Sequence, residues 1–103
     1  MVSKHYKSER YRREKFIDKY LNGGGKVIDS FIVDNHHPNG LERHDVTENG
    51  IIVVYNVKSN RLVTKLIARP QQIKRLYHNS GKVVPEWLLN LCGWHESLRY
   101  NKL

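Results

Sequence analysis

The sequence has few of the residues that disulfide-linked or membrane-spanning proteins need. Its one cysteine, Cys92, excludes a disulfide within the chain, and because it lies in an apolar run we expect a buried thiol. No stretch approaches the roughly 18–20 apolar residues of a membrane-spanning helix. The first twenty residues are rich in Lys, Arg and Glu and lack the apolar run of a signal peptide. We therefore expect no membrane partner and a cytoplasmic location.

Acidic residues are also scarce. The chain has 18 Lys and Arg against 10 Asp and Glu, which gives a formal net charge of +8. The excess is uneven, because residues 1–19 carry +4, residues 20–60 carry −2 and residues 61–103 carry +6. An excess of this size often reflects contact with phosphates, so RNA is the partner that we expect. The alternative is a protein that is merely soluble and basic.

Hydrophobic periodicity and turn residues predict a single α+β domain over residues 1–103. We expect an N-terminal helix, about four antiparallel strands joined by tight turns, and two C-terminal helices. The expected segments are a flexible basic start at 1–7, a basic helix at 8–21, and an α+β core at 26–103, with strands at 26–34, 44–47, 51–57 and 61–68, a loop at 35–43, and helices at 70–79 and 84–100.

The expected helices have recognisable ends and apolar faces. Ser8 should cap the first helix, Asn22 to Gly25 should end it, and Pro70 should begin the second helix. The side chains that we expect to face inward are Phe16, Ile17, Tyr20 and Leu21 in the first helix, Ile73, Leu76 and Tyr77 in the second, and Trp87, Leu88, Leu91, Trp94 and Leu98 in the third.

A cluster of histidines is the strongest candidate for chemistry. His36, His37 and His44 lie within nine residues of one another, close to Glu42. Two imidazoles beside a phosphodiester can act as general base and general acid, and a fixed cation can stabilise the charge that develops on phosphorus. This reasoning selects His37, His44, Glu42, Thr64 and Arg69 as catalytic candidates, with Arg43 and Lys65 as further cations.

Other interpretations of this cluster remain open. The loop can be a polar turn whose histidines are exposed and idle. His37, Glu42 and His44 provide three potential zinc ligands, but their spacing matches no specific zinc signature, so we expect no metal and no cofactor. The loop also resembles the first half of an HNH nuclease motif, whose later ligands lie on a helix, whereas strands are expected to follow here.

Aromatic and basic residues alternate in two other segments. Exposed tyrosine rings and arginine planes can stack on unpaired bases. The candidates for nucleic-acid binding are therefore Arg10, Arg12, Arg13 and Lys15 near the N-terminus, Arg43 and Lys65 in the expected sheet, and Lys74, Arg75 and Tyr77 in the second helix. The alternative for the first group is an ordinary solvated helix face with pairs such as Arg10 and Glu14.

Several of these motifs resemble those of a known group of proteins. A His-x-x-Gly-x-Glu-x-His core is present as His37, Gly40, Glu42 and His44, followed by the turn Asn49-Gly50 and a Thr-x-Leu-Ile-Ala-Arg-Pro block that begins at Thr64 and is followed by Gln72, Ile73 and Arg75. This pattern, over roughly residues 27–101, is similar to small proteins of phages, plasmids and other mobile elements of Gram-positive bacteria.

That group in turn resembles the barnase–EndoU–colicin–RelE superfamily of metal-independent ribonucleases. The resemblance implies an N-terminal helical part, a four-stranded antiparallel sheet and a bacterial host cell. It also implies His37 and His44 as acid and base candidates, and Thr64 and Arg69 as phosphate contacts. Arg75-Leu76-Tyr77 departs from the group's pattern, because an aromatic pair is expected there.

Three functional hypotheses follow. The first is a metal-independent ribonuclease that cleaves by attack of the 2′-hydroxyl. The second is a non-enzymatic protein of a mobile element that binds RNA or inhibits a host RNA-guided defence ribonucleoprotein. The third is a DNA-binding regulator in which helices 70–79 and 84–100 mimic a helix-turn-helix, although the strands before them favour packing on a sheet.

Overall fold

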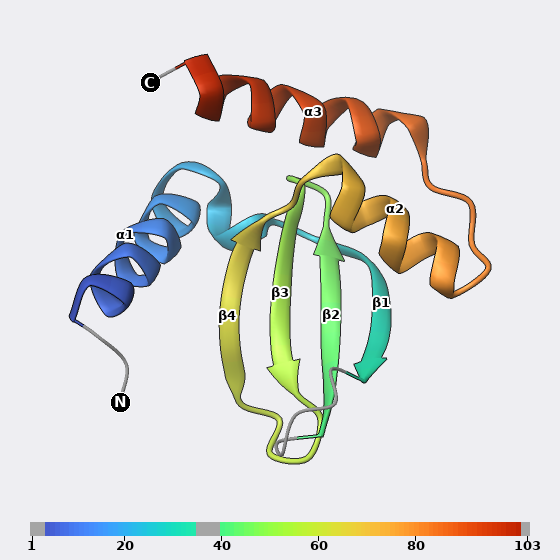
Figure 1. The fold of residues 1–103 in the computed structure, drawn as a ribbon, viewed down its shortest axis with the longest axis horizontal. Helices are drawn as coiled ribbons and strands as arrows, with labels where there is room; N and C mark the ends of the chain where they lie inside the picture. Colours follow the sequence, from blue (N-terminus) through green and yellow to red (C-terminus); the bar gives the residue numbers. More distant parts are fainter. Residues whose placement is uncertain (1–3, 35–39, 102–103) are drawn as a thin grey trace. The chain divides into compact units, whose positions relative to one another are not determined.

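A computed structural model describes residues 4–34 and 40–101, with side chains at 10–34 and 40–98. The chain divides into two compact units, Met1–Leu66 and Ile67–Leu103. In chain order it has an N-terminal helix, a four-stranded antiparallel sheet and two C-terminal helices (Figure 1). This confirms the predicted fold class. The prediction that residues 1–103 form a single domain stays a prediction.

The sheet has the simplest possible order, β1-β2-β3-β4. Its strands are β1 (Val27–Asp34), β2 (Leu41–Thr47), β3 (Ile51–Asn56) and β4 (Leu62–Ile67). The turn between β2 and β3 ends at Gly50, whose φ of 76° suits a residue without a Cβ. The next turn is closed by a 2.9 Å hydrogen bond from the Asn56 N–H to the Arg61 carbonyl. Adjacent strands joined by tight turns must pair antiparallel, as the sequence predicts.

The core of the first unit lies around the turn between β2 and β3. Val46 and Thr47 at the end of β2 are buried, and so are all four residues from Ile51 to Val54. Because successive side chains of a strand point to opposite faces, both faces of the sheet are covered here. The other end of β2 is more open, since Leu41 is exposed and residues 42–44 are half-buried.

The glycine-rich segment after the first helix ends that helix and also packs against the turn between β2 and β3. Residues Asn22–Gly24 form a short 3-10 helix, and Gly24, with a φ of 112°, lies against Thr47 and Ile51. The turn holds this segment in place, because Asn49 donates one hydrogen bond from its side chain to the Leu21 carbonyl (2.8 Å) and one from its backbone to the Gly24 carbonyl (3.2 Å).

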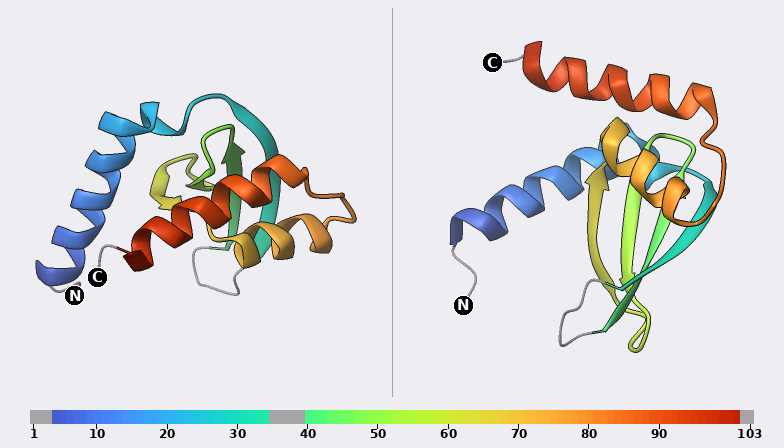
Figure 2. Two further views of the ribbon diagram at one scale, coloured as in Figure 1. Left: turned by 90° about the horizontal axis from the view of Figure 1, so that it is seen from above. Right: turned by 45° about the vertical axis from the view of Figure 1, so that its right-hand side comes forward.

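Helix α1 (Lys4–Tyr20) meets the sheet at β4, and both Figures 1 and 2 show its first turns running away from that edge. Arg13 donates hydrogen bonds from Nε to the Lys65 carbonyl (2.9 Å) and from Nη2 to Oγ1 of Thr64 (3.0 Å). The Lys65 ammonium is also paired with Asp18 at 2.7 Å. Polar contacts therefore dominate the attachment of α1 to the sheet.

Several expectations for the first unit were wrong in detail. Helix α1 begins at Lys4 rather than at residue 8, so Ser8 lies inside the helix and residues 4–7 are helical. Strand β2 begins at Leu41 rather than at His44, so residues 41–43, which were expected in a loop, belong to the strand. Of the four side chains expected to face inward from α1 and its end, only Ile17 is buried, whereas Phe16 and Tyr20 are exposed. The polar attachment to β4 removes the need for a wide apolar face.

The second unit contains helices α2 (Pro70–Asn79) and α3 (Glu86–Asn101), which run in opposite directions (Figure 1). Helix α2 begins at Pro70, and Ile73 and Tyr77 are buried, as predicted. In α3 the buried side chains are Leu88 and Cys92, which confirms the buried thiol. Leu91 is half-buried, and the expectation was wrong for Trp87, Trp94 and Leu98, which are exposed.

The expectation for α3 was wrong because this helix has two apolar stripes. At 100° per residue, Trp87, Trp94 and Leu98 share one face, and Leu88 and Cys92 lie about 120° around the helix from it. The sequence pattern alone does not say which stripe is buried.

In the described part of the chain, no helix combines the length and apolar character required to cross a membrane.

Candidate functional site

Strand β2 brings two of the predicted catalytic residues together. Glu42 and His44 are two positions apart and therefore project from the same face of the strand. Nε2 of His44 lies 3.1 Å from Oε1 of Glu42, and each side chain is 17% exposed. The pair is thus largely shielded from bulk solvent and partly accessible at the surface.

The neighbouring strands provide an apolar wall for this pair. His44 is opposite Phe31 of β1 and Val54 of β3 in the sheet register, and both of these residues are buried. Directly opposite residues of antiparallel strands have neighbouring side chains on the same face. A carboxylate that accepts a hydrogen bond from one imidazole nitrogen fixes the ring's tautomer and leaves the other nitrogen as an acceptor. The arrangement can therefore accept and return a proton.

Arg43 belongs to a different cluster on the opposite face of the sheet. Its Nε donates to Oδ1 of Asp45 at 3.1 Å, and its guanidinium carbon lies 4.5 Å from the centre of the Tyr55 ring. The same Asp45 oxygen accepts a hydrogen bond from Ser30 at 2.7 Å. Asp45 is buried, and these two donors compensate for the loss of hydration. Arg43 is consequently not positioned to serve His44.

Thr64 and Lys65 have structural partners on α1. The Thr64 hydroxyl accepts a hydrogen bond from Arg13, and the Lys65 ammonium is paired with Asp18. Strand β3 lies between their strand and β2, and two strand spacings amount to about 10 Å. The structure therefore does not bring Thr64 beside Glu42 and His44. Sequence reasoning missed this role of Arg13 because the partners are more than fifty residues apart in the chain.

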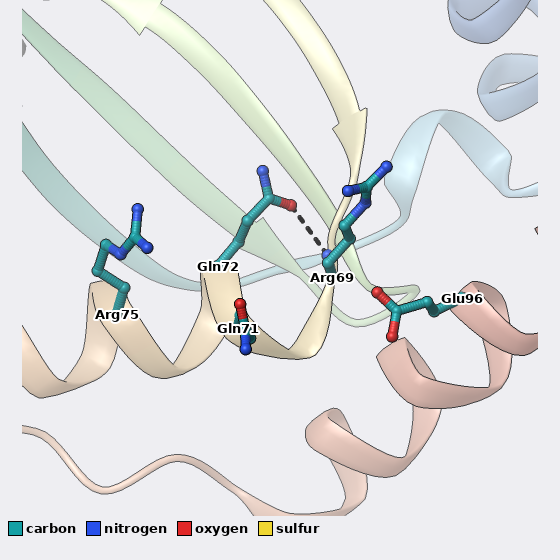
Figure 3. Close-up of a pocket in the computed structure, with 5 residues that line it drawn as sticks. All are labelled: Arg69, Gln71, Gln72, Arg75 and Glu96. Carbon is teal, nitrogen blue, oxygen red and sulfur yellow. Dashed lines mark hydrogen bonds between the residues drawn. The ribbon is translucent and has the colours of Figure 1, made fainter.

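Arg69 lies in the second unit, at the start of α2. Its backbone N–H donates to Oε1 of Gln72 at 2.9 Å. A pocket of about 410 Å³ is lined by Arg69, Gln71, Gln72, Arg75 and Glu96. Figure 3 shows the side chains of Arg69, Gln72 and Arg75 on one side of α2, while Glu96 approaches from α3. Two guanidinium groups and an amide make this side of the pocket suitable for an anion.

His37 lies outside the described residues, so its predicted role stays a prediction. Among the residues that the structure describes, no group of three or more His, Cys, Asp and Glu side chains is placed to hold a metal ion.

His95 differs from His44 in its surroundings, because its Nδ1 is buried without a hydrogen-bond partner in the described structure. Burial lowers the pKa of His95.

The residues predicted to bind nucleic acid fall into three groups. Arg10 is paired with Glu14 at 3.4 Å, and Arg13 and Lys65 join α1 to β4. The Tyr77 ring is buried, as expected for an inward-facing residue of α2, and its predicted role in nucleic-acid binding stays a prediction. The exposed cations are Arg12 and Lys15 on α1, and Lys74 and Arg75 on α2.

Comparisons with known proteins add nothing to this geometry. No family model, no curated protein and no solved structure matches the chain.

Proposed function

We propose that this protein binds RNA and cleaves it without a metal ion, with Glu42 and His44 as its proton-transfer pair. The observation that carries the proposal is the hydrogen-bonded, half-shielded contact between these two side chains. The net charge of +8 supports it, because a positive potential concentrates a polyanionic substrate near the protein.

The proposed reaction needs one base and one acid. The imidazole of His44 takes the proton of a ribose 2′-hydroxyl, and the 2′-oxygen attacks the adjacent phosphorus. The bond from phosphorus to the 5′-oxygen breaks, and that oxygen must receive a proton. The carboxylate of Glu42 stabilises the imidazolium meanwhile. His37 is the residue that the sequence offers as the acid. The products are a 2′,3′-cyclic phosphate and a 5′-hydroxyl.

The test is RNA cleavage by the purified protein in the presence of EDTA, with tRNA, rRNA and a guide RNA as substrates. We expect product ends with 2′,3′-cyclic phosphate. His44→Ala should lower the rate by about 10²–10⁴-fold, the usual contribution of general base catalysis, and Glu42→Gln should lower it less. The matched control is His78→Ala, since His78 is exposed on α2. Equal rates for wild type and His44→Ala would overturn the proposal.

A second candidate is a protein that binds RNA, or a host ribonucleoprotein, without cleaving it. It is favoured by the contact of Arg13 with Thr64, which engages the hydroxyl expected to bind phosphate. Such a protein should keep its effect when His37 and His44 are both replaced by alanine. It should lose that effect when the exposed residues Arg12 and Arg75 are neutralised.

A further inference from the structure

The outward face of α1 exposes aromatic rings that a helix packed through its apolar side would bury. Tyr11, Phe16 and Tyr20 are 59%, 43% and 63% exposed. Together with three cations they line a shallow groove of about 270 Å³, which we call the α1 groove; its residues are Tyr11, Arg12, Lys15, Phe16, Lys19 and Tyr20. From Arg12 to Lys19 the groove extends along two turns of helix, on the order of 10 Å.

The described acidic side chains of α1 and the cations of the α1 groove lie on different sides of the helix. Among the α1 residues whose side chains are described, 10–20, the acids are Glu14 and Asp18, which are paired with Arg10 and Lys65. None of these four residues lines the α1 groove. The charged residues that line the groove among residues 10–20 are all cations, which are complementary to a phosphate chain.

The cations of the α1 groove lie beside its rings. Nζ of Lys15 is 4.8 Å from the centre of the Tyr11 ring, and Nζ of Lys19 is 5.2 Å from that of Tyr20. The Phe16 and Tyr20 ring centres are 5.1 Å apart. Hydrogen bonding with Tyr11 raises the pKa of Lys15, so this ammonium stays charged at neutral pH. A ring with an adjacent ammonium can hold one nucleotide by its base and its phosphate together.

We propose that the α1 groove binds unpaired RNA, with Tyr11 and Tyr20 stacking on bases and with Lys15 and Lys19 contacting phosphates. Stacking requires the flat face of a base, which a duplex keeps inside its own stack. The inference shares with the proposed function only the RNA partner, and it does not require the Glu42–His44 pair.

The experiment measures binding to a fluorescent 12-nucleotide 2′-O-methyl RNA, which has no free 2′-hydroxyl and cannot be cleaved by the proposed route. A duplex of the same sequence should bind more weakly. Tyr11→Ala and Tyr20→Ala should each weaken binding to the single strand about 5- to 150-fold, the range given by 1–3 kcal/mol of stacking. Tyr20→Phe should keep most of the affinity, since the ring remains. Trp87→Ala is the matched control, because Trp87 is an exposed aromatic on a different helix.

Salt dependence tests the phosphate contacts separately. Lys15→Gln and Lys19→Gln should each reduce the slope of log K against log salt by about 0.7, the value for single strands. Three results would overturn the inference: tyrosine variants that bind like wild type, equal binding of duplex and single strand, or binding to anionic vesicles in place of RNA. The far-ultraviolet circular dichroism of each variant shows whether its helices are intact.

The outcomes also separate this inference from the proposed function. If His44→Ala abolishes cleavage of a tRNA but binds the methylated strand normally, both stand. If the tyrosine variants bind normally and wild type still cleaves, only the α1 groove is refuted. If wild type binds the strand through the tyrosines but never cleaves RNA, only the ribonuclease is refuted.

Discussion

Replacement of Arg13 by alanine should release the middle of α1 from the edge of the sheet. The guanidinium of Arg13 makes two hydrogen bonds to β4, at 2.9 Å to the Lys65 carbonyl and at 3.0 Å to the Thr64 hydroxyl. A hydrogen bond with a charged partner contributes about 1.5–3 kcal/mol. Since this site is only partly buried, we take the lower end of that range for each bond, which gives about 3 kcal/mol for the two.

Urea unfolding measures this loss, and hydrogen exchange locates it. In Arg13→Ala the unfolding midpoint should fall, and the amides of α1 should exchange faster than those of β2 and β3. Arg13→Lys should recover less than half of the loss, because one ammonium cannot replace two guanidinium nitrogens directed at separate acceptors. Arg12→Ala is the control, since Arg12 is exposed on the same helix and should change stability by less than about 0.5 kcal/mol.

Two results would refute this reasoning. The first is an equal effect of Arg13→Ala and Arg12→Ala on the free energy of unfolding. The second is a loss of RNA affinity in Arg13→Ala with unchanged stability and unchanged exchange in α1. That second result would make Arg13 a nucleic-acid contact, as the sequence predicts.

Three further predictions concern single positions. Gly24→Ala should destabilise the fold by about 1–3 kcal/mol in thermal unfolding, because a Cβ there would lie 3.0 Å from Thr47 on a backbone with a φ of 112°. Cys92 should react with a thiol reagent only after unfolding, since burial raises the pKa of its thiol to about 11; rapid labelling of the folded protein would contradict this. His95 has a lowered pKa, so the unfolded chain binds more protons than the folded chain as the pH falls through 6.5, and stability should decrease towards acid. His95→Leu should weaken that pH dependence and raise stability at neutral pH by on the order of 1 kcal/mol, because a buried nitrogen without a partner is removed.

The sequence predicted the fold wherever local rules decide the structure. Gly50 has the positive φ that its turn requires, Pro70 begins α2, and the β-branched runs form adjacent antiparallel strands. Prediction from the sequence was wrong where a contact with a residue far along the chain determines the structure. The buried face of α1 is narrow because Arg13 contacts a strand about fifty residues away, and no local pattern contains that information.

In the candidate site, too, local rules predict some features and contacts between distant residues determine others. Alternation along a strand is a local rule, and it places Glu42 and His44 on one face, in agreement with the 3.1 Å contact between their side chains. The same rule requires Arg43 to point to the opposite face, where Asp45 holds it. No local pattern around Thr64 indicates a contact with Arg13, and the structure shows that the Thr64 hydroxyl is part of the contact between α1 and β4.

The way α1 is attached also accounts for the exposure of its rings. A helix that packs through a wide apolar stripe would have to bury Phe16 and Tyr20 to remain in place. Here Ile17 is the buried side chain among those described in α1, and Arg13 and Asp18 provide the remaining contacts with the sheet. Stability and the proposed binding thus involve opposite sides of one helix. The effects of Arg13→Ala on unfolding and of Tyr20→Ala on RNA affinity should therefore be separable, with their stability changes adding to within about 0.5 kcal/mol in the double variant.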